Sequence, residues 1–181
     1  MDLSVLTKEK LTFNTNRLSI YPMQYQHLDE FKCLQCDEKL MEYIGPTLSD
    51  AAIKEKFEQR ITCFDDNQQW FTLLINDSSN EKFIGSIGFR IVDVDSQRVE
   101  IGYLALSDVQ GKGFITEATK ALIIFLQHQL KVKKIVANCA IDNIGSWKVM
   151  EKVGLNKEGT LKADFKVNER WFDAYTYALV F

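Results

Sequence analysis

Apolar and polar residues recur along the chain with two different periods, and each change of period marks a predicted element. Alternation over residues 17–23 predicts a first strand, which Pro22 would end because proline donates no ladder hydrogen bond. Apolar residues at helical spacing then predict two helices, at about 25–41 and about 50–64. Ser49 precedes the second helix as its expected N-cap. The chain should therefore begin with a strand and a helical pair.

Three apolar, β-rich runs form the next part of the chain, at 70–76, 83–92 and 99–106. Turn-forming residues separate the first two runs and predict a hairpin, which the third run extends into an antiparallel meander. An amphipathic helix is predicted at 116–130, followed by a strand at 134–140. The apolar stripe of this helix should pack on the sheet.

The C-terminal part of the chain repeats the change from helix to strand. A short helix at about 144–153 should end at Gly154, because glycine suits the left-handed position just past a helix. Two last runs, at about 160–167 and 171–181, predict a closing antiparallel pair with a turn at 168–169. The complete order of elements predicts a mixed α/β fold.

Length and composition favour one soluble domain. The 181 residues are 46% hydrophobic and 26% charged, which is typical of a globular chain that folds throughout. We expect a single domain over 1–181, with 1–14 as a loosely attached N-terminal segment. The net charge of −3 argues against general nucleic-acid binding, which needs a concentrated basic surface. The N-terminus lacks a signal-like apolar core and no run is long enough to span a bilayer, which predicts a cytoplasmic protein without a membrane partner.

The cysteines do not indicate a metal site. Cys33 and Cys36 form a C-x-x-C pair, but neither a second pair nor a histidine cluster completes a zinc site. We expect these two residues, with Cys63 and Cys139, to be reduced and buried or half-buried.

The most informative segment joins the strand at 99–106 to the helix at 116–130. Its glycines let the backbone approach an anion closely, and the helix start offers free N–H groups with partial positive charge. These features predict a loop that binds a diphosphate. The loop consists of Gln110, Gly111, Lys112, Gly113, Phe114, Ile115 and Thr116.

Two common diphosphate ligands do not suit this loop. A nucleoside triphosphate loop has serine or threonine after its lysine, whereas Gly113 follows Lys112. A dinucleotide loop opens the first helix of a parallel βαβ unit, whereas this loop follows an antiparallel meander and carries Ile115 in place of a third glycine. A glycine turn that holds no ligand stays open as an alternative.

The loop resembles the acetyl-CoA signature Q/R-x-x-G-x-G/A of the GNAT superfamily, with Gln110, Gly113 and Ile115 at the three positions. Isoleucine stands where the signature has glycine or alanine. Other segments, spread over residues 15 to 180, resemble the ribosomal-protein alanine N-acetyltransferase branch of that superfamily. They are Arg17-Leu18, Asn143-Ile144-Gly145-Ser146, Val153-Gly154-Leu155, Glu158-Gly159, and Asp173 with Tyr177.

The resemblance implies a fold and a coenzyme. The fold is a twisted mixed sheet of about six to seven strands, flanked by about four helices and splayed between the strands at 99–106 and 134–140. Acetyl-CoA would lie in the split, with its pantetheine arm on the backbone of Leu104 and Leu106 and its diphosphate on the amides of 111–116. Ala105, Asn143 and Ser146 complete the implied coenzyme site, and no metal is implied.

An amine that attacks a thioester needs a base, an oxyanion donor and a proton donor for the leaving thiolate. We expect a backbone N–H near Leu104 to stabilise the oxyanion. Many GNAT enzymes have a tyrosine as the thiolate donor, but Met150 occupies that position here. The branch resemblance implies Ser146 instead, and the alternative is that Ser146 only caps its own helix. The resemblance implies Asp164 as the base, with Glu100 as the rival and a surface role open for both.

These residues predict an acetyl-CoA-dependent N-acetyltransferase that transfers the acetyl group directly in a ternary complex. The branch resemblance implies that the acceptor is the N-terminal amine of a protein, such as a ribosomal protein. Two alternatives stay open: an acetyltransferase for small amines such as an amino acid, a polyamine or an aminoglycoside, and a non-catalytic acyl-CoA sensor. A monomer and a homodimer are both compatible with the sequence.

Overall fold

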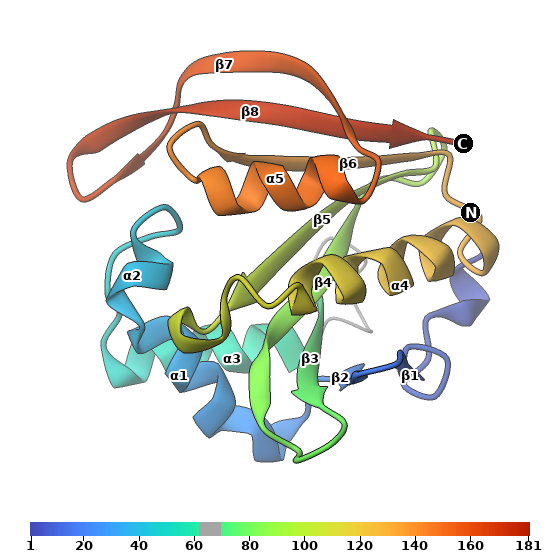
Figure 1. Cartoon of the computed structure of the whole chain (residues 1–181), viewed down its shortest axis with the longest axis horizontal. Coiled ribbons are helices and arrows are strands. Elements are labelled where there is room, and N and C mark those ends of the chain that lie inside the picture. Colours follow the sequence, from blue (N-terminus) through green and yellow to red (C-terminus); the bar gives the residue numbers. More distant parts are fainter. Residues whose placement is uncertain (62–69) are drawn as a thin grey trace.

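A computed structural model describes residues 1–61 and 70–181, and its described strands form one mixed sheet (Figure 1). The spatial order of the strands is β1-β2-β3-β4-β5-β6-β8-β7, and all neighbours are antiparallel except β5 and β6. The strands are β1 (Phe13–Asn14), β2 (Leu18–Pro22), β3 (Phe71–Asp77), β4 (Phe83–Asp93), β5 (Arg98–Ala105), β6 (Lys134–Ala140), β7 (Asn156–Val167) and β8 (Arg170–Val180).

Helices cover both faces of the sheet. They are α1 (Leu28–Cys36), α2 (Glu38–Met41), α3 (Asp50–Ile61), α4 (Phe114–His128) and α5 (Ile144–Lys152). In Figure 1, α4 and α5 lie in front of the sheet and α3 lies behind it. A separate apolar cluster lies on each face. Leu73 and Ile75 of β3 belong to the cluster that contains α4, whereas Leu74 belongs to the cluster that contains α1 and α3. Alternation along β3 thus supplies a core to each face.

The sheet splays between β5 and β6. Strand β5 pairs with β4 as far as Ala105, but it pairs with β6 only where residues 98–100 meet residues 134–136. Beyond Glu100 the two strands diverge, and none of the described strands pairs with the last part of β5 on that side. The mixed α/β fold and its central split are therefore confirmed.

Over residues 1–61 and 70–181 the sheet has eight strands, against the about six to seven predicted, because β1 adds a strand at the N-terminal edge. Residues 1–14 are not loosely attached in the structure. Val5 and Leu11 are buried in the core on the α4 face, and the Asp2 N–H donates to the Leu130 carbonyl at 2.8 Å. Apolar contacts hold the N-terminal segment against the core, and its mixed, charged composition does not predict them. A single domain over 1–181 stays a prediction.

The helix expected at 25–41 is interrupted, so five α-helices are described where four were predicted. A 3-10 turn precedes α1, and Asp37 has extended backbone angles between α1 and α2. Its carboxylate accepts hydrogen bonds from the N–H groups of Leu40 and Ser107 and from the Ser107 hydroxyl, at 2.9 to 3.0 Å. Asp37 thereby caps α2 and ties it to the end of β5. The last residues of the helix expected at 50–64 lie outside the described residues.

Other local predictions are confirmed. The Ala52 N–H donates to the Ser49 hydroxyl at 3.3 Å, as an N-cap requires, and Gly154 has a φ of +94° just past α5. The described helices include none that is long and apolar enough to cross a membrane. The prediction for the cysteines is wrong in part, because Cys33 and Cys36 are free and exposed while Cys139 is half-buried. Cys63 lies outside the described residues.

Candidate functional site

A cavity of about 860 Å³ opens where β5 and β6 diverge, a size that suits a cofactor or small-molecule ligand. The ends of the two strands, the glycine loop, α5, the segment from α2 to Ile44, and the bulge of β7 around Asp164 all line it. Of the residues predicted from the sequence, those that line the cavity are Glu100, Leu104, Ala105, Gln110, Gly111, Gly113, Phe114, Ile115, Thr116, Asn143, Ser146 and Asp164. Leu106 and Lys112 do not line it.

The glycine loop has the backbone geometry expected of an anion-binding loop. Gly111 and Gly113 have φ angles of +79° and +80°, in the left-handed region that favours glycine. Helix α4 begins directly after Gly113, and the Glu117 N–H donates to the Gly113 carbonyl at 3.1 Å as the first bond of the helix. The preceding N–H groups have no partner within the helix, so they are directed beyond its N-terminus. Ile115 packs against the core, which accommodates its larger side chain.

The open edge of β5 differs from the sequence-based expectation. The backbone of Leu106 is already occupied, because its N–H donates to the Ile84 carbonyl at 3.0 Å and its carbonyl accepts from Val109 at 3.1 Å. Backbone groups alternate along a strand, so Leu104 also directs its N–H and carbonyl toward β4. The groups that face the split belong to Tyr103 and Ala105, and the Gln110 side chain donates to the Ala105 carbonyl at 3.0 Å.

Ser146 and Tyr103 place two hydroxyl groups side by side at the cavity. The Tyr103 hydroxyl donates to the Ser146 carbonyl at 2.8 Å, and the Ser146 hydroxyl donates to the Tyr103 oxygen at 3.3 Å. Burial raises the pKa of Tyr103 well above its usual value, so the phenol stays neutral. Ser146 does not cap α5, since Asn143 is the cap residue and its side chain accepts from the Ser146 N–H at 3.1 Å.

Sequence reasoning missed Tyr103. The available signal was its position in β5, next to the strand residues chosen as coenzyme contacts, with a side chain on the face opposite to that of Glu100. No local pattern connects it to Ser146, because α5 reaches that face of the sheet only in the folded chain.

The two candidate bases have different surroundings. Glu100 is largely covered and forms an ion pair with Arg90, whose Nε and Nη2 lie 2.8 and 2.6 Å from the same oxygen, Oε2. The Asn138 side chain donates to its other oxygen at 3.3 Å, and the Arg90 guanidinium lies over the Trp70 ring. Arg90 and Asn138 therefore hold the Glu100 carboxylate in place, and the Trp70 ring packs against Arg90.

Asp164 is exposed and stands on a bulge of β7 at the rim of the cavity. The bulge is fixed by Asp173, whose carboxylate accepts from the Ala163 N–H at 2.9 Å and pairs with Lys162 at 2.6 Å. Within this bulge Ala163 has a φ of +47°, in the left-handed region. Among the described residues, no group of three or more histidine, cysteine or acidic side chains could hold a metal.

Comparisons with known proteins agree on one family. A model of the acetyltransferase (GNAT) domain matches residues 17–156. YjcK, a probable N-acetyltransferase of Bacillus subtilis, is 34% identical over 57% of this chain and 58% of its own length. YnaD of the same organism, an uncharacterized N-acetyltransferase, is 26% identical over 92% of this chain and 95% of its own length. The ribosomal-protein-serine acetyltransferase of Escherichia coli is 31% identical over 55% of this chain and 56% of its own length.

Solved structures show the same fold at lower identity. A GNAT-family acetyltransferase from Bacillus anthracis superposes with a TM-score of 0.82 at 22% identity, over 93% of this chain and 98% of its own. A ribosomal L7/L12 alpha-N-protein acetyltransferase, solved with coenzyme A, superposes with a TM-score of 0.82 at 19% identity, over 92% of this chain and 95% of its own. This chain thus shares the fold of these proteins over most of its length.

Proposed function

The chain belongs to the acetyltransferase (GNAT) family and is an acetyl-CoA-dependent N-acetyltransferase, and from this membership we propose that its acceptor is the N-terminal amine of a protein. One observation carries the proposal: the divergence of β5 and β6 leaves an open cavity that is lined both by the glycine loop and by the carboxylates of Glu100 and Asp164. Two of the similar proteins are named for ribosomal proteins, which supports a protein acceptor.

In the proposed complex, the diphosphate of acetyl-CoA lies on the free N–H groups at the start of α4, where the helix dipole favours an anion. The pantetheine arm lies along the open edge of β5, on the backbone groups of Tyr103 and the N–H of Ala105, rather than on the backbone groups of Leu104 and Leu106. One of these N–H groups then stabilises the oxyanion of the thioester carbonyl. Gln110 contributes by holding the end of this edge in place.

The acetyl transfer follows from the groups around the split. The neutral amine attacks the thioester carbon, the new C–N bond forms, and the C–S bond breaks as the oxyanion collapses. The amine gives its proton to a carboxylate, either Asp164 or Glu100, directly or through water. The Ser146 hydroxyl protonates the leaving thiolate and regains its proton from solvent. Tyr103 holds that hydroxyl in position through the contact at 3.3 Å.

The acceptor is tested with a panel of amines in a thiol-release assay with acetyl-CoA. The panel contains peptides with a free N-terminus, the same peptides with the N-terminus blocked, an amino acid, a polyamine and an aminoglycoside. We expect turnover of free peptides and none of blocked peptides, with mass spectrometry placing the acetyl group on the α-amine. Faster turnover of a small amine would contradict the proposed acceptor, because the site would then select a compact substrate. Coenzyme binding without turnover of any amine would indicate a sensor.

A further inference from the structure

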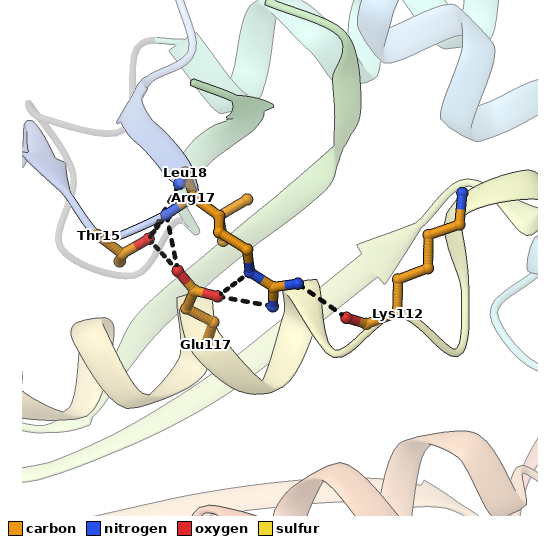
Figure 2. A network of polar contacts seen from close by, with 5 residues as sticks. All are labelled: Thr15, Arg17, Leu18, Lys112 and Glu117. Carbon is orange, nitrogen blue, oxygen red and sulfur yellow. Dashed lines mark hydrogen bonds and ion pairs between the residues drawn. The ribbon is translucent and has the colours of Figure 1, made fainter. Parts of the chain in front are cut away.

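Arg17 connects the N-terminal part of the chain to the glycine loop (Figure 2). Its guanidinium donates through Nη1 to the Lys112 carbonyl at 3.2 Å, and through Nε to Glu117 Oε2 at 2.7 Å. Nη2 lies 2.7 Å from the same oxygen of Glu117, and the guanidinium also lies over the Phe114 ring. One side chain thus holds both the loop and the first turn of α4.

Glu117 is held from more than one direction. Its Oε1 accepts from the Thr15 hydroxyl at 2.6 Å and from the Arg17 N–H at 3.1 Å. Burial would raise the pKa of this carboxyl, but the hydrogen bonds from Thr15 and Arg17 hold it below its usual value, so Glu117 is ionised at neutral pH. The side chains of Arg17 and Glu117 are 46% and 21% exposed, and a pair this exposed contributes little to stability. The ion pair between Arg17 and Glu117 instead helps to position the glycine loop, because Arg17 also binds the Lys112 carbonyl.

The contact with the Lys112 carbonyl sets the direction of the next N–H group. The peptide bond between Lys112 and Gly113 is trans and planar, so its carbonyl and its N–H point in opposite directions. Because the carbonyl points to Arg17, the Gly113 N–H points to the other side of the loop. Gly113 lines the cavity, and a coenzyme diphosphate bound there on the side away from Arg17 would meet this N–H.

The ion pair with Glu117 also changes the charge at the start of α4. A carboxylate in the first turn of a helix suits the helix dipole, but it repels a bound diphosphate nearby. Arg17 neutralises that carboxylate on the side of the loop. The same residue therefore orients one diphosphate donor and removes a source of repulsion.

We propose that Arg17 is a positioning residue for coenzyme binding, which aims the Gly113 N–H into the cavity and neutralises Glu117 at the diphosphate site. This inference rests on the proposed function, in which the loop holds the diphosphate of acetyl-CoA. It assigns a role in coenzyme affinity to a residue that does not itself line the cavity.

Calorimetry on the variant Arg17→Gln tests the inference, with coenzyme A and pantetheine as ligands. Pantetheine lacks the diphosphate, so only coenzyme A binding should depend on Arg17. We expect the affinity for coenzyme A to fall about tenfold, as for a lost hydrogen bond to a charged group, while pantetheine affinity is unchanged. As the affinity falls, the KM for acetyl-CoA should rise, whereas kcat at saturating acetyl-CoA should stay constant. The coenzyme A affinity of Arg17→Lys should lie between those of the wild type and Arg17→Gln, because lysine keeps the charge but lacks the planar guanidinium.

Two further variants separate positioning from a general structural role. Lys134→Gln removes a surface ion pair of 2.7 Å with Glu158 outside the cavity, and it should leave both affinities unchanged. The double variant Arg17→Gln, Glu117→Gln should regain part of the lost coenzyme A affinity, because the unpaired carboxylate is gone. An unchanged affinity in Arg17→Gln, or an equal loss for both ligands with a lower melting temperature, would overturn the inference. A wild-type chain that binds no coenzyme A would instead overturn the proposed function.

Discussion

The two faces of the sheet present different chemistry at the split between β5 and β6. On the face covered by α4 and α5, Tyr103 and Ser146 offer neutral hydroxyl groups in a partly buried contact. On the other face, Glu100 is ionically paired with Arg90 beside Trp70. Alternation along β5 creates this division, because Glu100 and Tyr103 are an odd number of residues apart. The difference suggests that the thiolate departs toward the hydroxyl face and the amine approaches from the carboxylate face.

Removing both hydroxyl groups should have the largest effect. We expect the double variant Tyr103→Phe, Ser146→Ala to lower kcat roughly a hundredfold, within the range for loss of a proton donor. Coenzyme A affinity should change little, because the diphosphate loop is untouched. Ser146→Ala alone should account for most of the loss, since Tyr103 acts through Ser146. Stopped-flow thiol release and calorimetry measure the two quantities, and an unchanged kcat would remove both hydroxyls from the mechanism.

Neutralising the carboxylates should have the next largest effect. Glu100→Gln and Asp164→Asn keep the size of each side chain, and the variant that lacks the base should lose about tenfold or more in kcat/KM. The loss of kcat/KM should become smaller as the pH rises through the pKa of the acceptor amine, because the amine then arrives unprotonated. That pH is about 8 for an α-amine and about 10.4 for a lysine-like amine, so the profile also reports the acceptor. A kcat/KM equal to that of the wild type in both variants would contradict a carboxylate base.

A small change on the carboxylate face should affect only the acceptor. A Cβ added at Gly102 would lie 3.0 Å from the Trp70 ring, so in Gly102→Ala the ring must shift by a few tenths of an ångström. We expect the KM for the amine to rise a few-fold at most, with the KM for acetyl-CoA constant, because mild overpacking is tolerated when a side chain can move. Gly45→Ala is the matched control, since nothing lies within 4 Å of its added Cβ. A change in the KM for acetyl-CoA would argue against separate faces.

The smallest effect is expected when the pH of the assay is raised, because the Tyr103 phenol on the hydroxyl face should stay protonated. Burial raises the pKa of Tyr103, so the phenol keeps its proton at pH values where a free tyrosine would begin to lose it. The kcat of the wild type should therefore show no decline due to Tyr103 between about pH 8 and about pH 10. A decline over this range that is absent in Tyr103→Phe would show that the tyrosine ionises during turnover.

The coenzyme side of the site could be predicted from the sequence in large part. The glycine loop is a local feature, because positive φ angles at Gly111 and Gly113 and the start of α4 depend on neighbouring residues. The candidate residues Ser146 and Asp164 rested on resemblance rather than on local physics. The structure brings both to the cavity, and their catalytic roles stay predictions.

Other features could not be predicted because they depend on contacts between distant segments. The carboxylate of Asp37 interrupts the first helical stretch by capping α2 and binding Ser107, which lies 70 residues away in the chain. The burial of Val5 and Leu11 likewise requires the finished core on the α4 face. Hydrophobic periodicity carries no information on either contact, since it reports only the neighbours of a residue along the chain.

By itself the sequence determined the periodic strands and helices, the glycine turn and the family to which the chain belongs, because these depend on short-range backbone preferences and on patterns of residues in order. Only the tertiary structure decided which backbone groups of β5 stay free, that Tyr103 meets Ser146, and that Arg17 reaches the Lys112 carbonyl. The physical reason is that hydrogen bonds and ion pairs act over a few ångströms in space, whatever the separation along the chain.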